Sequence, residues 1–196
     1  MFLNPFARRG GNPHVLAVSM TGVKLGDRVV FVGAPDPART AAIAAKVGLS
    51  GRASAAVPDA AAAARLDRAA ANAGVLVDAD ISDARKLPYG DSEFDLAVID
   101  DTGALFETVD QSHRAAIARE AARVLRPGGR IVVLGGSELS GLSKLLSKAA
   151  VSPLVLSGSI NTLLGANGFS IVRTLAEREG LVFVEGLKPR TPGVPA

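Results

Sequence analysis

The residues that could do chemistry in this chain include acids at the predicted end of a buried strand. The run Phe94–Asp101 is typical of a strand in a parallel sheet, and it closes on Asp100 and Asp101. A carboxylate there can orient a substrate hydroxyl, or act as a general base if its pKa is raised. The alternative is a solvated strand end with no chemical role. Both interpretations stay open, with Asp101 as the candidate base.

His14 is the second candidate base. It follows Pro13 in a stretch rich in Asn, Pro, Arg and Gly, which predicts an extended arm over residues 1–14. A lone histidine beside a proline is more often a surface residue, and that alternative is kept. The chain has two histidines and no cysteine, which excludes disulfides and thiol catalysis and predicts no metal site.

Composition narrows the classes of partner. Aromatic residues make up 4% of the chain and the net charge is +3 from scattered basic residues, which disfavours nucleic-acid binding. The absence of cysteine and of a secretory signal pattern predicts a cytoplasmic protein. Residues 149–172 carry no charge, but Ser, Pro, Gly and Asn interrupt them, so no stable membrane insertion is expected.

Strand and helix patterns alternate along the chain. Strands are predicted over 28–33, 52–57, 75–79, 94–101 and 130–135, with an antiparallel pair over 169–175 and 181–187. Helices are predicted over 15–20, 38–47, 59–73 and 111–125. This order predicts an α/β, Rossmann-like fold: a seven-stranded, mostly parallel sheet with helices on both faces and an antiparallel C-terminal strand pair. Ligands of such sheets bind outside the C-terminal strand ends.

The turn after the first strand is unusual. Nucleotide-binding sheets have a glycine-rich turn that follows an acid; here Phe31 takes the place of the acid, and Pro35 and Pro37 take two glycine places. Proline lacks an N–H and fixes φ, so it can neither donate a hydrogen bond nor adopt a positive φ. Asp36 suits a helix N-cap. The turn predicts an altered cofactor pocket, with Phe31 filling either the core or the pocket.

Three segments resemble the class I S-adenosylmethionine-dependent methyltransferases, in the quinone- and sterol-methyltransferase branch. They are Asp83–Asp95, Leu96–Asp101 and Ala122–Val133, the last of which joins a helix, Pro-Gly-Gly and a buried strand. Their order matches the family from about Gly26 to Lys188. The resemblance implies S-adenosylmethionine as cofactor and a methyltransferase-like domain over 15–188, between the arm and a flexible tail over 189–196.

The resemblance also implies a cofactor site, residue by residue. Asp83, with Ala84 beside it, matches the acid that holds the adenine amino group; its alternative role is a turn contact. Gly33 and Ala34 match the loop that approaches the ribose and the methionine part, and Asp100 lies at the same edge.

The acid that holds the ribose hydroxyls in this family is absent. Its place is taken by Val57 or Pro58, and Asp59, one step beyond, can substitute after a shift. Each unmade hydrogen bond would weaken binding by roughly 1–3 kcal/mol.

We predict a methyltransferase that acts on a small, largely apolar acceptor, with residues 139–164 either as a lid or as a helix that seals the sheet. A homodimer is a possible assembly. The alternative is a catalytically inactive methyltransferase-like module for binding or oligomerisation, which has lost normal cofactor binding. Phe31, Pro35, Pro37 and the missing ribose acid motivate this alternative. The acceptor and the methylated atom are not encoded in any motif.

Overall fold

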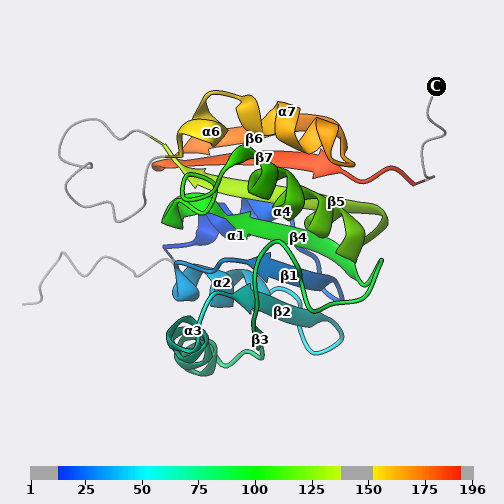
Figure 1. Cartoon of the computed structure of the whole chain (residues 1–196). Helices are drawn as coiled ribbons and strands as arrows, with labels where there is room; N and C mark the ends of the chain where they lie inside the picture. The colour runs from blue at the N-terminus through cyan, green and yellow to red at the C-terminus, as the bar shows by residue number, and fades with distance from the viewer. Residues whose placement is uncertain (1–12, 138–151, 191–196) are drawn as a thin grey trace, which may run out of the picture.

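A computed structural model describes residues 13–137 and 152–190 of the chain (Figure 1). The strands are β1 (Arg28–Val32), β2 (Arg52–Val57), β3 (Asp78–Ile81), β4 (Phe94–Asp100), β5 (Leu125–Gly136), β6 (Ser170–Arg178) and β7 (Leu181–Leu187). They form one seven-stranded sheet in the order β3-β2-β1-β4-β5-β7-β6. Strands β1 to β5 pair in parallel, and β7 runs antiparallel to β5 and β6. The predicted fold class is confirmed.

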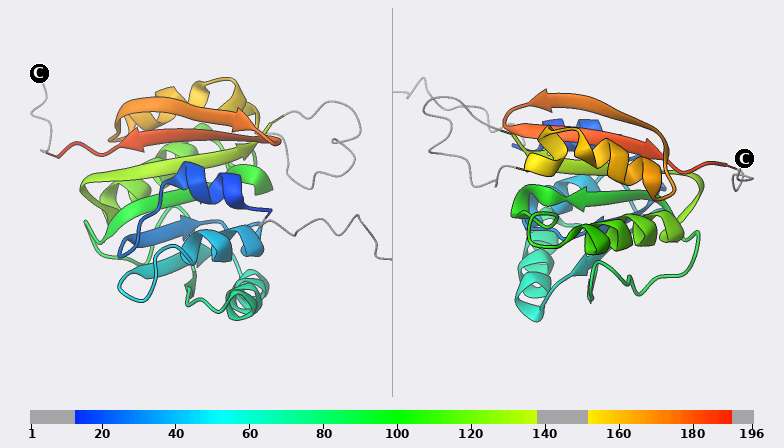
Figure 2. Two further views of the ribbon diagram at one scale, coloured as in Figure 1. Left: turned by 180° about the vertical axis from the view of Figure 1, so that it is seen from behind. Right: turned by 45° about the horizontal axis from the view of Figure 1, so that its top comes forward.

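Helices cover both faces of this sheet (Figures 1 and 2). They are α1 (Val15–Thr21), α2 (Pro37–Ala44), α3 (Ala60–Ala73), the short 3-10 helix η1 (Asp101–Gly103), α4 (Gln111–Val124), α6 (Pro153–Leu156) and α7 (Ser159–Ala166). Alternate residues of each strand face opposite sides. Val30 and Val32 therefore pack in the core beneath α4, α6 and α7, whereas Val29 and Phe31 pack in the core beneath α1, α2 and α3.

The predicted N-cap residues of α2 and α3 accept hydrogen bonds from the first turns of these helices. Asp36 caps α2 by accepting the N–H of Arg39 at 3.1 Å, and Asp59 caps α3 by accepting the N–H of Ala62 at 2.7 Å. Gly74 ends α3 with a φ of +67°, a left-handed conformation that glycine adopts without strain. These caps fix where the connections after β1 and β2 turn back toward the sheet.

Several strand boundaries differ from the prediction, among them the end of β6, which reaches Arg178 instead of Leu175. β3 begins at Asp78 instead of Val75, because the N–H of Val75 bonds to the carbonyl of Ala70 at the end of α3. β5 begins at Leu125, which pairs with Phe94 before the register shifts.

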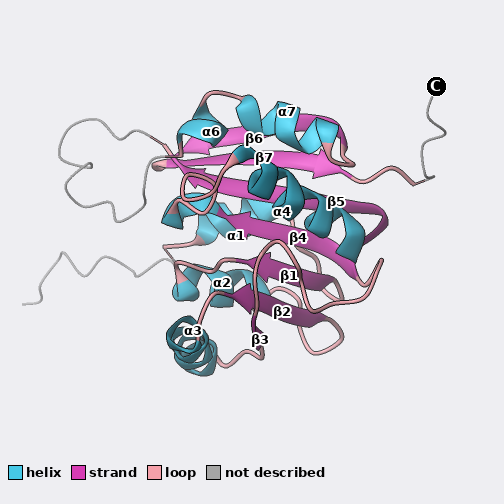
Figure 3. Cartoon of the chain, in the orientation of Figure 1, coloured by secondary structure: helices cyan, strands magenta, loops and turns pink. Residues whose placement is uncertain are grey.

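Parts of three predicted segments lie outside the described residues: 1–12 of the arm, 138–151 of the region around the lid, and 191–196 of the tail. In the part that the structure describes, no helix is long and apolar enough to cross a membrane. The described part of the uncharged stretch forms the short helices α6 and α7, which lie over the sheet, and the first residues of β6 (Figure 3).

Candidate functional site

A large cavity lies at the carboxyl ends of β1 and β4, where the strand order reverses. Its volume is about 880 Å³, and loops from four connections line it. Its lining includes Gly33, Ala34, Pro35, Pro58, Arg65, Ser82, Asp83, Ala84, Arg85, Asp100, Gly103, Leu105, Asp110 and His113. A cavity at this reversal is where open parallel sheets bind ligands.

The loop after β1 approaches the cavity through two consecutive left-handed residues. Gly33 has a φ of +103° and Ala34 a φ of +64°, and the N–H of Gly33 donates to the carbonyl of Ala56 at 3.0 Å. A Cβ at Gly33 would lie 3.3 Å from the carbonyl oxygen of Asp100. The glycine therefore brings the backbone close to β4, and Ala34 adopts a conformation that is uncommon for a residue with a side chain.

Asp83 lines the cavity and forms an ion pair with Arg85, which also lines it. Its carboxylate accepts the backbone N–H of Arg85 at 2.8 Å, and the Arg85 guanidinium binds both carboxylate oxygens. These hydrogen bonds lower the pKa of Asp83 to about 2. The turn contact that sequence reasoning weighed against adenine binding is thus present, at the edge of the cavity, and an ionised acceptor lies beside Ala84.

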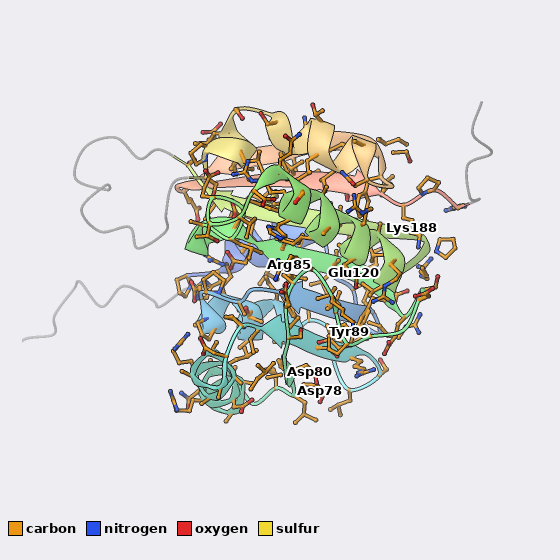
Figure 4. The ribbon with its side chains drawn as sticks, viewed as in Figure 1. Asp78, Asp80, Arg85, Tyr89, Glu120 and Lys188 are labelled. Atoms are coloured by element: carbon orange, nitrogen blue, oxygen red, sulfur yellow. The ribbon has the colours of Figure 1, made fainter. Side chains whose placement is uncertain are left out.

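The connection that carries Asp83 is fastened to α4. The Glu120 carboxylate accepts the N–H of Leu87 at 3.0 Å, and Arg123 donates to the carbonyls of Leu87 and Tyr89 at 3.2 and 2.9 Å. Figure 4 shows Arg85 and Tyr89 on this connection in front of the sheet, with Glu120 of α4 nearby. Sequence reasoning missed this attachment, although Glu120 and Arg123 stand three residues apart on a predicted helix.

Asp100 is buried in a polar network with Arg39 and Thr102. One carboxylate oxygen accepts from Nε and Nη2 of Arg39 at 3.0 and 2.8 Å. The other accepts from the N–H and the hydroxyl of Thr102 at 3.0 and 2.6 Å. Burial raises the pKa of Asp100, and the Arg39 guanidinium opposes that rise. Arg39 and Asp100 are 6% and 5% exposed, so this is a buried ion pair.

Asp101 is the first residue of η1 and does not belong to the lining of the large cavity. It is fully buried, and one of its carboxylate oxygens accepts the N–H of Phe106 at 2.8 Å. Burial raises the pKa of Asp101 to about 6, and the nearby carboxylates of Glu107 and Asp100 add to the rise. The raised pKa is what a general base requires, but the position holds the loop that follows η1. Its catalytic role stays a prediction.

A smaller cavity of about 500 Å³ lies between α1, the start of α2 and the turn from β6 to β7. His14, Pro35, Asp36, Arg39, Thr102, Gly103 and Glu179 belong to its lining. His14 therefore faces a cavity other than the one lined by Gly33, Ala34, Asp83, Ala84 and Asp100. Asp59 lines neither cavity, since its carboxylate caps α3. Phe31 also lies in the core and lines neither, as the core interpretation expects.

The described residues contain no cluster of three or more His, Cys, Asp or Glu side chains that could hold a metal ion. The cations and carboxylates around the large cavity are instead paired with one another, with one exception. Arg65 of α3 lines the cavity, and among the described residues no hydrogen bond or ion pair joins its guanidinium to another group.

Comparisons with known proteins agree with this architecture. The model of a family described as "Methyltransferase domain" matches residues 34–133. The ubiquinone/menaquinone biosynthesis C-methyltransferase UbiE of Pseudomonas aeruginosa is 39% identical over 100 residues, which are 49% of this chain and 35% of that protein. The same enzyme of Laribacter hongkongensis is 36% identical over 66 residues, 34% of this chain and 25% of that protein. These matches thus span about a third or less of the curated relatives.

A solved structure supports the fold over most of the chain. A SAM-dependent methyltransferase from Aquifex aeolicus superposes with a TM-score of 0.70 at 16% identity and covers 89% of each chain. At this identity the likeness concerns the fold. The family match begins at Ala34 in the loop after β1, includes the lining of the large cavity except Gly33, ends at Val133 within β5, and supports S-adenosylmethionine as the cofactor. This chain belongs to the methyltransferase domain family.

Proposed function

We propose that this chain is an S-adenosylmethionine-dependent methyltransferase that acts on a small, largely apolar acceptor. The observation that carries the proposal is the large cavity at the reversal of strand order, within the segment that matches the family. Its residues fit the adenosyl part of the cofactor. Asp83 offers an ionised acceptor for an exocyclic amine, Ala84 and Leu105 offer apolar contact, and Gly33 lets the backbone approach.

When bound, S-adenosylmethionine supplies a methyl group on a positively charged sulfur that is ready for in-line transfer. The protein then contributes orientation and the exclusion of water. His14, in the smaller cavity, is the residue that we propose to take a proton from an acceptor there, because its imidazole belongs to the lining. Asp101 is better suited to holding the loop after η1, whose residue Leu105 lines the large cavity.

The curated relatives are named for C-methylation in ubiquinone and menaquinone biosynthesis. A quinol precursor is therefore the first acceptor to assay, with S-adenosylmethionine as donor. We also propose a cytoplasmic location, as the absence of cysteine indicates. The possible homodimer can be tested by the molar mass in solution.

Thermal unfolding in the presence of S-adenosylhomocysteine tests the cofactor assignment. A ligand at a hundred times its Kd adds about 2.7 kcal/mol to stability, or about 5–10 °C in Tm for a chain of this size. Asp83→Asn should weaken binding about tenfold or more, because a hydrogen bond to a charged group is lost. Asp67→Asn on the exposed face of α3 is the matched control. No change of Tm at millimolar ligand would refute the proposal.

A further inference from the structure

Two acids near the loop after β1, Asp36 and Asp100, form ion pairs with the same residue, Arg39. Arg39 forms ion pairs with Asp100 at 2.8 Å and with Asp36 at 3.5 Å. Its side chain is 8% exposed, so the guanidinium is largely removed from water. A buried charge of this kind is held in place by its partners, since separating them would leave an uncompensated charge.

The Asp100 carboxylate has little capacity left for a ligand. Each of its oxygens already accepts two hydrogen bonds, from Arg39 on one side and from Thr102 on the other. The other carboxylates that line the large cavity are also engaged. Asp83 is bound by Arg85 and is the acceptor proposed for the exocyclic amine of the nucleoside, and Asp110 accepts the N–H of His113 at 2.9 Å and the hydroxyl of Ser112 at 2.7 Å. An ammonium group on a ligand would therefore compete with an internal donor at each of them.

Donors for a ligand carboxylate are also scarce at this loop, because Arg65, which is unpaired among the described residues, belongs to α3 and not to the loop after β1. Pro35 and Pro37 have no N–H. The N–H groups of Arg39 and Thr40 are taken by the Asp36 side chain at 3.1 Å and the Asp36 carbonyl at 3.1 Å. The start of α2, which could otherwise bind an anion, has largely satisfied its own donors.

The two cavities meet beside the hydrogen bonds that join Arg39, Asp100 and Thr102. Pro35 and Gly103 line both cavities, and a Cβ on Gly103 would lie 2.8 Å from the Cβ of Pro35. Asp100 lines the large cavity, whereas its partners Arg39 and Thr102 line the smaller one. The two cavities therefore adjoin at Pro35 and Gly103, and the ion pair lies beside this junction.

We propose that this site recognises the nucleoside of its ligand and gains little affinity from a zwitterionic amino-acid tail. The proposal rests on the proposed function, in that the large cavity is taken as the nucleoside pocket. We therefore expect a neutral nucleoside thioether to bind this site about as tightly as the same nucleoside with an amino-acid tail. Arg39 is then a specificity-determining residue, because it occupies the Asp100 carboxylate, which the ammonium of such a tail could otherwise use.

Calorimetric titration with two ligands tests this. 5′-Methylthioadenosine and S-adenosylhomocysteine share the nucleoside and the sulfur, and only the second has an amino-acid tail. We expect Kd values within tenfold of each other on the unaltered chain. If S-adenosylhomocysteine binds more than tenfold tighter, the inference is wrong while the proposed function stands. If neither ligand binds at millimolar concentration, both are wrong.

Two variants locate the cause. Arg39→Gln removes the internal cation, so S-adenosylhomocysteine should gain at least threefold in affinity relative to 5′-methylthioadenosine. Arg39→Lys keeps a cation and should retain the ratio of the unaltered chain. An unchanged ratio in a folded Arg39→Gln protein, verified by circular dichroism, would overturn the role of Arg39. Should that variant not fold, the two-ligand comparison on the unaltered chain still decides the inference.

Discussion

The buried carboxyl of Asp101 makes stability depend on pH in a direction opposite to that of most carboxylates. One of its oxygens accepts the N–H of Phe106, and the other is buried without a hydrogen-bond partner among the described residues. Burial raises the pKa of Asp101 from 3.8 to about 6. The folded chain therefore binds this proton more tightly than the unfolded chain. The resulting stabilisation is complete below about pH 4 and is lost as the pH rises through about 6.

The magnitude follows from the two pKa values. One pKa unit corresponds to about 1.4 kcal/mol, so a rise from 3.8 to about 6 corresponds to about 3 kcal/mol. Asp101→Asn keeps an oxygen for the N–H of Phe106 and cannot ionise. The free energy of unfolding of this variant, minus that of the unaltered chain, should therefore increase by about 2 kcal/mol between pH 4 and pH 7.5, because at pH 4 the unfolded carboxyl is already partly ionised.

Urea unfolding of both proteins at four pH values in this range measures the difference. Subtraction removes the contributions of groups with lowered pKa values, such as Asp83 and Glu120, whose effect on stability has the opposite sign. Asp67→Asn, at an exposed position, should give a difference that does not vary with pH. A flat difference for Asp101→Asn as well would refute the reasoning, because it would mean that burial leaves this carboxyl ionised at no cost.

Three further outcomes follow from the site. Arg39→Met should destabilise the fold by about 3–5 kcal/mol, because it leaves the buried Asp100 carboxylate unpaired; adding Asp100→Leu should recover most of the loss in urea unfolding. Asp59→Ala should cost about 1 kcal/mol of stability through loss of the α3 cap, yet leave the Kd for S-adenosylhomocysteine unchanged; a weaker Kd would assign Asp59 to the ligand instead. Pro58→Asp places a carboxylate at the exposed end of β2 beside the large cavity, so calorimetry should show tighter S-adenosylhomocysteine binding, by about 1–3 kcal/mol; an unchanged Kd would mean that the ribose lies elsewhere.

The sheet and most helix ends were predictable because their signals are local. β1 and β4 are apolar runs bounded by turn residues, and the caps Asp36 and Asp59 act within three residues of themselves. β3 was misplaced because Val75–Val77 are apolar and resemble a strand. The true strand contains Asp78 and Asp80, which a strand paired on one side with β2 tolerates at the edge of the sheet.

The site was predictable only in part. Gly33, Ala34, Asp83, Ala84 and Asp100 do line one cavity, as expected from the rule that parallel strands present their carboxyl ends at one edge. Their roles in binding stay predictions.

The ion pair of Arg39 with Asp100 joins residues 61 positions apart, and no local pattern specifies it. A signal was present nonetheless, since Arg39 is the one charged residue in the otherwise uncharged α2 segment Pro37–Ala44.

Arg130 attaches the C-terminal end of α1 to the sheet. Its guanidinium binds Glu185 of β7 and the carbonyl of Gly22, which follows the last residue of α1. A Cβ on Gly22, whose φ is +55°, would lie 2.8 Å from that guanidinium. The opposite end of the helix follows His14 beside the smaller cavity. The Arg130 contact therefore ties the C-terminal end of α1 to β5 and β7, toward the end of the sheet opposite to the carboxyl ends of β1 and β4, where the cofactor loops lie.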